Sequence, residues 1–265
     1  MKVWRLIIDG AGSASFNMAA DTFLLENAEN PQTEPVLRLY GWDKPSITIG
    51  YHQRLDRAIR LEALGDTPVV RRPTGGRALL HDSGEITYAL AGNYHVNNEL
   101  GETLQGSCQN IAEAVAFFYQ RLGWTVDICP KDTPVALSGG SREQKGCLAT
   151  VSRHEITING CKMAAGAQRR YGPSFLHHGI MRLRLPVMHP AINHGEPGRY
   201  QRAAFLLPPP TEVLPFVIDV FARRFAVGWR KRPWTGTELE AIGERIEDFA
   251  DMNRSNFVLN NEGDK

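Results

Sequence analysis

The segment from Val69 to Asp82 constrains the fold more than any other part of the chain. It begins with β-branched residues, is interrupted by Pro73, Gly75 and Gly76, and becomes apolar again at Ala78 before a polar turn. This alternation predicts a strand, a tight loop and a second strand. The glycines permit positive φ and close approach of backbone N–H groups, and the neighbouring arginines make the loop cationic. The loop therefore suits an anionic or carbonyl-bearing ligand, although a plain β-turn with solvent-facing arginines is an alternative interpretation.

Composition and charge exclude several classes of protein. With 265 residues, of which 42% are hydrophobic and 22% charged, the chain can bury a substantial core. Thirty basic and twenty-nine acidic side chains give a formal charge of +1, whereas duplex-binding proteins usually carry a clear basic excess. The N-terminal apolar run is too short for a signal peptide, and no apolar stretch approaches the length of a membrane span. We expect a cytoplasmic protein that binds neither nucleic acid nor membrane.

Hydrophobic periodicity predicts many short strands and a few helices. Two hairpins are expected, one around residues 41–45 and one around Asn159 and Gly160, a pair that suits a type I′ turn. Thr237 and Glu240 form a capping-box pair at the start of the last helix. Beside the two strands around the glycine loop, strands are predicted over 3–8, 36–40, 46–50, 86–91, 124–128, 154–158, 161–168 and 176–183, and helices over 15–28, 56–64, 103–122, 211–227 and 237–250.

These elements predict the fold class. Hairpins are too numerous for a doubly wound parallel sheet, so we expect an α+β fold with a mixed, largely antiparallel sheet flanked by helices. We expect a single catalytic domain over residues 1–265. Residues 208–265, which begin with a Pro-rich connector, are predicted to form its helical C-terminal section.

Two side chains are candidates for chemistry. Lys162 precedes a run of small residues that would let a ligand lie close to it, although spacing alone favours an outward-facing strand lysine. Cys147 follows a glycine-rich polar stretch and is flanked by Lys145 and Gly146. Such an electropositive setting lowers the pKa of a thiol and increases its thiolate fraction. The alternative for Cys147 is a small hydrophobic residue at the start of a strand.

The other cysteines and the paired histidines have simpler interpretations. Cys108 lies on the apolar stripe of the helix over 103–122, and Cys161 faces away from Lys162, so both are predicted to belong to the core. Adjacent strand residues His177 and His178 face opposite ways, so at most one of them points into a shared site. No third ligand is evident, and we expect no metal site.

Several separated motifs, in the right order, resemble the biotin/lipoate protein ligase and octanoyltransferase family. The two main motifs are the glycine loop with His81 and Asp82, and the stretch from Gly160 to Arg170 that contains Lys162. The resemblance covers residues 4–185 and also includes the segments 16–19, 39–42 and 177–179.

Within that family the chain is most similar to the cysteine-dependent octanoyltransferase of lipoate synthesis. Arg77 stands where ATP-dependent ligases commonly have a third glycine. Cys147 lies fifteen residues before Lys162, which is the spacing of the family's nucleophile and lysine.

The resemblance implies a thioester mechanism without a cofactor. Cys147 would take an octanoyl group from acyl carrier protein and pass it to a lysine of a lipoyl-carrier protein. That acceptor would be the glycine cleavage H protein or a 2-oxoacid dehydrogenase lipoyl domain. Lys162 would lower the pKa of the thiol and stabilise the oxyanion. The substrate-binding residues implied are Arg71, Arg72, Thr74, Gly75, Gly76, Arg77, Ala78, His81, Gly166, Ala167 and His178, with Arg169, Arg170 and Arg71 steering acidic partners.

Two alternatives remain open. In an ATP-dependent lipoate ligase, Lys162 and the glycine loop would hold an acyl-adenylate, and ATP and magnesium would be required. In a non-catalytic module, the chain would only dock lipoyl or carrier domains.

Overall fold

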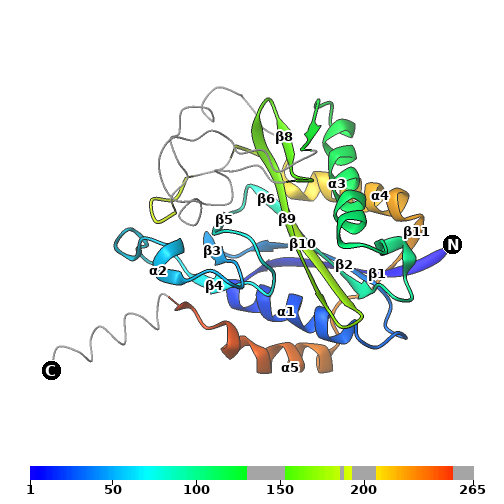
Figure 1. Ribbon diagram of the computed structural model, residues 1–265, viewed down its shortest axis with the longest axis horizontal. Helices are drawn as coiled ribbons and strands as arrows, with labels where there is room; N and C mark the ends of the chain where they lie inside the picture. The colour runs from blue at the N-terminus through cyan, green and yellow to red at the C-terminus, as the bar shows by residue number, and fades with distance from the viewer. Residues whose placement is uncertain (130–152, 186–187, 193–206, 253–265) are drawn as a thin grey trace.

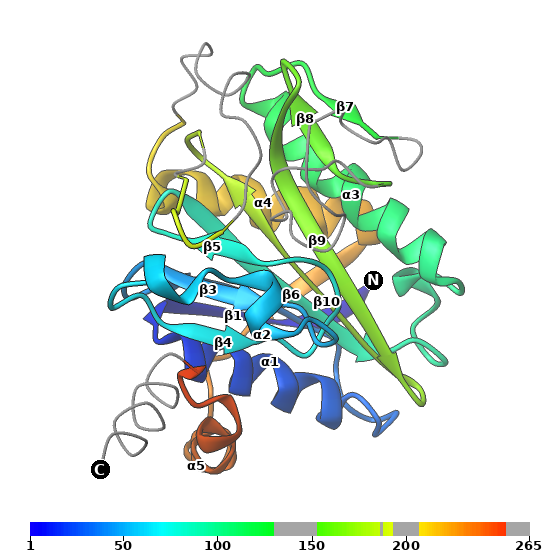
Figure 2. The same ribbon diagram turned by 60° about the vertical axis from the view of Figure 1, so that its left-hand side comes forward.

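Two β-sheets form the framework of the protein. The computed structural model describes residues 1–129, 153–185, 188–192 and 207–252. Within these residues, an eight-stranded sheet has the order β11-β1-β2-β6-β10-β9-β8-β7, and a three-stranded sheet has the order β4-β3-β5 (Figures 1 and 2). The large sheet consists of β1 (Lys2–Gly12), β2 (Val36–Trp42), β6 (Glu85–Asn93), β7 (Asp127–Ile128), β8 (Ile156–Ile158), β9 (Cys161–Tyr171), β10 (Ser174–Arg182) and β11 (Val227–Lys231), and the small sheet of β3 (Ser46–Ile49), β4 (Val69–Arg71) and β5 (Leu79–His81).

Helices cover both faces of the large sheet. In Figure 1, α3 and α4 lie on one side of it, and α1 and α5 lie on the other. Strand alternation explains this arrangement, because Leu37 and Leu39 of β2 pack in the core with α3 and α4, whereas Val36 and Tyr40 pack in the core with α1. The helices are α1 (Ala14–Asn27), α2 (Leu55–Ala58), α3 (Leu104–Arg121), α4 (Pro210–Phe225) and α5 (Gly236–Arg245), with 3₁₀ turns at Leu61–Ala63, Asn98–Leu100 and Ile246–Phe249.

The predicted α+β fold is confirmed, and so is the mixed, largely antiparallel sheet. In the large sheet, β1 runs parallel to β2 and β11, and the other pairings are antiparallel. The hairpin between β8 and β9 also forms as predicted, with Asn159 at φ 50° and Gly160 at φ 76°. No helix in the described part of the chain is long and apolar enough to cross a membrane.

Four local predictions are wrong. The hairpin expected around residues 41–45 does not form, because β2 joins the large sheet whereas β3 pairs with β4 and β5 in the small one. The helix expected over 56–64 is split between α2 and a 3₁₀ turn. The C-terminal section is not purely helical, since β11 extends the large sheet beside β1. The capping box of α5 is formed by Thr235 and Glu238, two residues before the predicted pair.

Glu238 also ties α5 to the large sheet. Its carboxylate accepts a hydrogen bond of 2.8 Å from Nη2 of Arg5, a buried residue of β1. Burial by itself raises the pKa of Glu238, but the hydrogen bonds from Arg5 and Thr235 outweigh burial and lower this pKa to about 2. This carboxylate therefore stabilises the folded protein fully above its ordinary pKa of 4.5, and the stabilisation is lost as the pH falls from 4.5 towards 2.

We expect this linkage to be measurable in the variant Glu238→Gln. At pH 7 the variant should unfold at a lower urea concentration than the wild type, because Arg5 loses a charged acceptor. The difference between the two proteins should shrink between pH 4.5 and pH 2, since the wild-type carboxylate becomes protonated there. Urea denaturation followed by tryptophan fluorescence at a series of pH values measures both effects. A constant difference across that range would contradict the assignment.

Candidate active site

A cavity of about 350 Å³ lies between the large and the small sheet. This volume is at the lower end of the range of small-molecule sites, about 300–1,000 Å³. The cavity is lined by β2, β6, β9 and β10 of the large sheet, by β3 and β5 of the small sheet, and by the glycine loop between β4 and β5. Its apolar lining includes Leu79, Ala165 and Ile180, which pack together as a small buried cluster. A ligand with an apolar chain and a polar end suits this lining.

Arg72 holds the glycine loop in shape. Its guanidinium donates hydrogen bonds to the carbonyl oxygens of Gly75 and Arg77, at 2.7 and 2.9 Å, and to Oγ1 of Thr48 in β3 at 3.1 Å. Arg72 is buried, so these bonds are shielded from water. The preceding arginine, Arg71, points away from the cavity and donates to three backbone carbonyls between residues 50 and 53. Arg72 therefore belongs to the cavity wall and Arg71 to the support of the neighbouring loop.

Two glycines permit the loop to lie close to the small sheet. Gly76 adopts φ 95°, a conformation that other residues rarely adopt. A Cβ atom at Gly50, just after β3, would lie 2.0 Å from the carbonyl oxygen of Gly76. The backbone at both positions is thus packed too closely for any side chain.

A β-bulge turns Lys162 into the cavity. Ile156 of β8 pairs with Ala164, but the next residue of β8 pairs with Lys162, so Met163 is an extra residue on β9. In a regular strand, Lys162 and the cavity-lining Ala165 would face opposite sides, because they are three positions apart. The bulge places both on the cavity wall. Lys162 is only 1% exposed, so the outward-facing interpretation of this lysine is wrong.

The ammonium group of Lys162 is paired with a carboxylate. Nζ lies 2.6 Å from Oε1 of Glu155, which precedes β8, and the Glu155 side chain is itself 10% exposed. A buried charge is tolerated when it is paired in this way. The arrangement supplies a positive charge at the cavity wall, where a developing oxyanion or thiolate would be stabilised.

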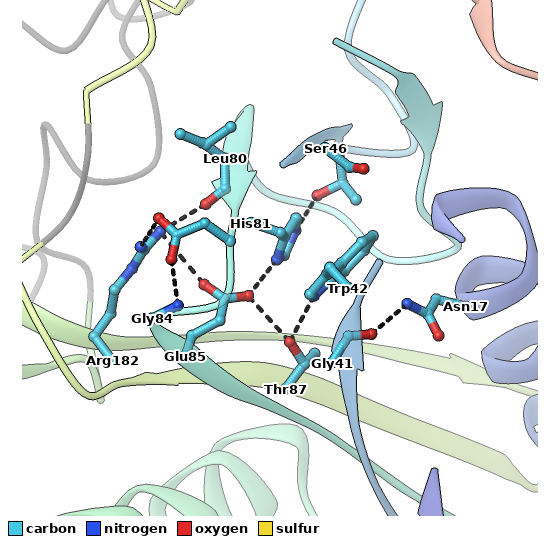
Figure 3. Close-up of polar contacts among 12 residues, drawn as sticks. Asn17, Gly41, Trp42, Ser46, Leu80, His81, Gly84, Glu85, Thr87 and Arg182 are labelled. Atoms are coloured by element: carbon cyan, nitrogen blue, oxygen red, sulfur yellow. Dashed lines mark hydrogen bonds and ion pairs between the residues drawn. The ribbon is translucent and has the colours of Figure 1, made fainter. Parts of the chain in front are cut away.

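Hydrogen-bonded polar side chains form one end of the cavity. Trp42 Nε1 donates to Thr87 Oγ1 at 2.8 Å, and Thr87 donates to Oε1 of Glu85 at 3.0 Å (Figure 3). The same carboxylate oxygen lies 2.7 Å from Nδ1 of His81, whose Nε2 lies 2.9 Å from Thr48 Oγ1. The ring nitrogens of Trp42 and His81 thus have polar partners. The faces of these two rings can therefore contact an apolar chain without leaving a buried donor unpaired.

The ring of His81 is held neutral. It stacks on Trp42, with ring centroids 4.0 Å apart. Burial lowers the pKa of His81, and the neighbouring Glu85 only partly offsets this effect. Glu85 in turn lies 3.4 Å from Nη2 of Arg182, whose side chain is fully buried. The histidine therefore contributes a neutral face to the site.

His178 contacts the glycine loop from the large sheet. Nε2 lies 2.6 Å from Oγ1 of Thr74, and Nδ1 lies 2.8 Å from Oδ2 of Asp21 in α1. Its neighbour His177 faces the other side of the sheet and stacks on Tyr88, as the alternation of a strand predicts. Burial lowers the pKa of His177 to about 3.

The structure places most of the predicted site residues together. Thr74 contacts His178 as described. Ala78 packs in the core of the small sheet, and Arg71 binds backbone carbonyls of the loop after β3, so neither lines the cavity. Cys147 lies outside the described residues. The predicted residues that line the cavity are Arg72, Gly75, Gly76, Arg77, His81, Lys162, Gly166, Ala167 and His178.

Two of the other cysteines, and an arginine predicted to steer partners, have structural contacts. Cys161 is buried in the core as predicted, but Cys108 is only half-buried, with its Sγ 3.5 Å from Oε1 of Gln168. Burial raises the pKa of both thiols, so both remain protonated at neutral pH. Arg169 donates to the carbonyl of Pro73 in the glycine loop and stacks on an exposed tyrosine.

Sequence reasoning missed the partners of the site residues. Asp21, Glu85 and Glu155 each pair with a residue of the predicted site. Asp21 is far from His178 in the sequence, whereas Glu85 and Glu155 lie four and seven residues from their partners. The sequence pattern does not show which of these carboxylates faces the site.

Fold and site together define an α+β protein with a lysine-bearing apolar cavity between two sheets. Residues 13–189 match the family model described as the lipoyl protein ligase A/B catalytic domain. The chain therefore belongs to the lipoyl protein ligase A/B catalytic domain family.

Curated relatives and solved structures are similar to this chain. It is 35% identical to Octanoyltransferase LipM of Kyrpidia tusciae over 70% of this chain and 68% of that one. It is 32% identical to Octanoyltransferase LipM of Bacillus subtilis over 69% of this chain and 66% of that one, so the match spans about two thirds of these relatives. A lipoate-protein ligase A solved with bound ATP shares the fold, with a TM-score of 0.72 and 20% identity over 93% of this chain and 95% of that chain. The lipoate protein ligase of Thermoplasma acidophilum, solved with its E2 lipoyl domain, has a TM-score of 0.67 and 17% identity over 93% of both chains.

Proposed function

We propose that the protein is a cytoplasmic octanoyltransferase of protein lipoylation. It would move an octanoyl group from acyl carrier protein to a lysine of a lipoyl-carrier protein, the glycine cleavage H protein or a 2-oxoacid dehydrogenase lipoyl domain. The observation that carries the proposal is the buried Lys162 on the wall of an apolar cavity, in a chain whose curated relatives are named octanoyltransferases.

The proposed reaction consists of two exchanges at one carbonyl carbon. In the first, the Cys147 thiolate forms a new C–S bond, and the C–S bond to the carrier thiol breaks as that thiol takes a proton. In the second, the acceptor lysine forms a C–N bond, and Cys147 leaves as a thiolate while the amine loses a proton. The thioester exchange is nearly energy-neutral and amide formation is downhill, so the proposed reaction requires no ATP.

Residues of the described site have defined parts in this proposal. The acyl chain would lie between the two sheets, against Leu79 and Ile180. The charge of Lys162 would favour the thiolate form of Cys147 and stabilise the oxyanion that forms during each exchange. The Arg72-supported loop would form the wall beside the reacting carbonyl.

Intact-mass measurement tests the proposal. We expect the enzyme to gain one octanoyl group when it is mixed with octanoyl acyl carrier protein, and hydroxylamine should remove that group. The variant Cys147→Ala should neither gain the mass nor transfer the group to a lipoyl domain. Cys108→Ala is the matched control and should behave as the wild type, because burial keeps its thiol protonated. Full transfer activity in Cys147→Ala would refute the thioester step.

The ligase alternative predicts a different result. It requires ATP, magnesium and a free fatty or lipoic acid, and it would catalyse acid-dependent pyrophosphate exchange. We expect no such exchange. Exchange together with unacylated Cys147 would favour the ligase, and binding of carrier domains without any turnover would favour the non-catalytic module.

A further inference from the structure

A chain of polar contacts, fully buried at Arg38 and Asp21, joins the C-terminal segment to α1. It begins at Trp234, between β11 and α5, whose Nε1 donates to Oδ2 of Asp9 in β1 at 2.9 Å. The same oxygen accepts from Nε of Arg38 in β2 at 2.7 Å, and Nη1 of Arg38 donates to Oδ1 of Asp21 at 2.9 Å. Arg38 and Asp21 are fully buried. Trp234 of the C-terminal segment thus meets three consecutive N-terminal elements, β1, α1 and β2, in one network.

From Asp21 the contacts continue to the glycine loop. Its Oδ2 accepts hydrogen bonds from Tyr40 Oη and His178 Nδ1, both at 2.8 Å, and Nε2 of His178 contacts Thr74 Oγ1. The backbone carbonyl of Thr74 accepts from the amide of Tyr51 at 2.8 Å, which closes the loop against the small sheet.

The charge of Asp21 fixes the direction of the hydrogen bond between Asp21 and His178. Burial raises the pKa of Asp21, but the bond from His178 and the charge of Arg38 outweigh burial and hold this pKa below its ordinary value. An ionised carboxylate only accepts, so Nδ1 of His178 must carry a proton. With a proton on Nδ1, Nε2 faces the hydroxyl group of Thr74 at 2.6 Å, and the two groups share one hydrogen bond. Asp21 therefore orients the ring that contacts the loop.

We propose that Asp21 and Trp234 are positioning residues that hold Thr74, and with it the glycine loop, in the position that acyl transfer requires. Trp234 and Asp9 lie outside residues 13–189, the part of the chain that matches the family model. The C-terminal segment thus contributes to the site without touching the cavity. The role in acyl transfer rests on the proposed function, whereas the anchoring of the loop does not.

The network is rigid, because its central residue makes several buried hydrogen bonds at once. The guanidinium of Arg38 donates to Asp9, to Asp21 and to both the backbone carbonyl and the side-chain oxygen of Asn17. It also lies 3.9 Å from the ring centroid of Tyr40. Buried charge-assisted hydrogen bonds are shorter and stronger than neutral ones, so a change at one end must be accommodated at the next.

Thr74→Val tests the loop end of the chain. Valine keeps the shape of threonine but removes the hydroxyl, so His178 loses its partner. We expect kcat for octanoyl transfer to fall about tenfold, as for the loss of one strong hydrogen bond, and the melting temperature to fall by a few degrees, because His178 is buried. Thr74→Ser restores the hydroxyl and should recover most of the rate. Equal rates in Thr74→Val and the wild type would overturn the proposal.

Asp21→Asn and Trp234→Phe test the remote end. Both should quicken hydrogen exchange at the Tyr51 amide, because the carbonyl of Thr74 is then held less firmly. Asp21→Asn should also shift or abolish the downfield proton resonance of His178 Nδ1–H. The matched control is Trp229→Phe, which removes an indole donor of the same segment that bonds only to the Ile218 carbonyl among its described contacts. This control should leave the exchange of Tyr51 and the resonance of His178 unchanged.

These measurements distinguish the anchoring of the glycine loop from the proposed octanoyltransferase function. If the resonance and the exchange respond as stated but the wild type transfers no octanoyl group, the anchoring stands and the proposed function fails. If the wild type transfers the group but neither readout responds to Asp21→Asn or Trp234→Phe, the positioning role is refuted.

Discussion

Replacing Lys162 with methionine should lower the rate of octanoyl transfer by about 10²–10³-fold, the loss that follows removal of one oxyanion-stabilising donor in other acyl-transfer enzymes. Methionine is similar in length but carries no charge. Lys162 is almost fully buried on the cavity wall, where a charge acts more strongly than in water. Transfer from octanoyl acyl carrier protein to a lipoyl domain, followed by mass spectrometry, measures the loss.

Loss of folding must be distinguished from loss of catalysis. Lys162→Met removes the ammonium group that lies 2.6 Å from the carboxylate of Glu155, and breaking a buried ion pair is destabilising. The double variant Glu155→Gln/Lys162→Met removes both charges and should regain stability while remaining inactive. Lys2→Met is the control, because its ion pair with Glu99 is exposed. A double variant with wild-type activity would show that the charge of Lys162 is not needed.

Arg182→Met should lower the free energy of unfolding by about 3–5 kcal/mol, the usual result of breaking a buried ion pair. The Arg182 side chain is fully buried in β10 and contacts the carboxylates of Asp82 and Glu85, at 3.3 and 3.4 Å. Its Nη2 also donates to the carbonyl of Leu80 at 2.6 Å. Without the arginine, two buried carboxylates each lose one of their donors, and the carbonyl of Leu80 loses the hydrogen bond from Arg182. Urea denaturation at pH 7 measures the change.

Arg184→Met provides the matched comparison. Arg184 lies 3.3 Å from the same Asp82, but its side chain is 44% exposed. Exposed ion pairs contribute about 0.2–1 kcal/mol, so this variant should remain close to the wild type. Similar losses in both variants would show that burial does not govern the strength of these contacts.

Much of the architecture was predictable because it depends on neighbouring residues. The turn at Asn159 and Gly160 requires positive φ, which these two residues adopt readily, so the β8–β9 hairpin could be predicted from sequence. The apolar stripe that predicts α3 also determines which side of it meets the core. The glycine loop between two strands likewise follows from local chemistry.

Strand pairing was less predictable, because it depends on distant partners. The segments that form β2 and β3 have the pattern of a hairpin, yet β3 pairs with β4 and β5, which lie later in the chain. For the same reason β11 was missed, since among the described residues it pairs with β1 alone, more than 200 positions earlier in the sequence. A short apolar run indicates a strand but not its partner.

The sequence by itself determined the class of fold, the family motifs and the identity of the residues near the cavity. The tertiary structure alone decided which way they point. Only the bulge at Met163 turns Lys162 inward, and nothing in the local pattern separates Arg72, on the cavity wall, from Arg71, in the loop support. Asp21 reaches His178 across the fold, and Glu155 reaches Lys162 within the β8–β9 hairpin. Local sequence sets backbone conformation, whereas the register between strands and the pairing of buried charges are settled only when the whole sheet has formed.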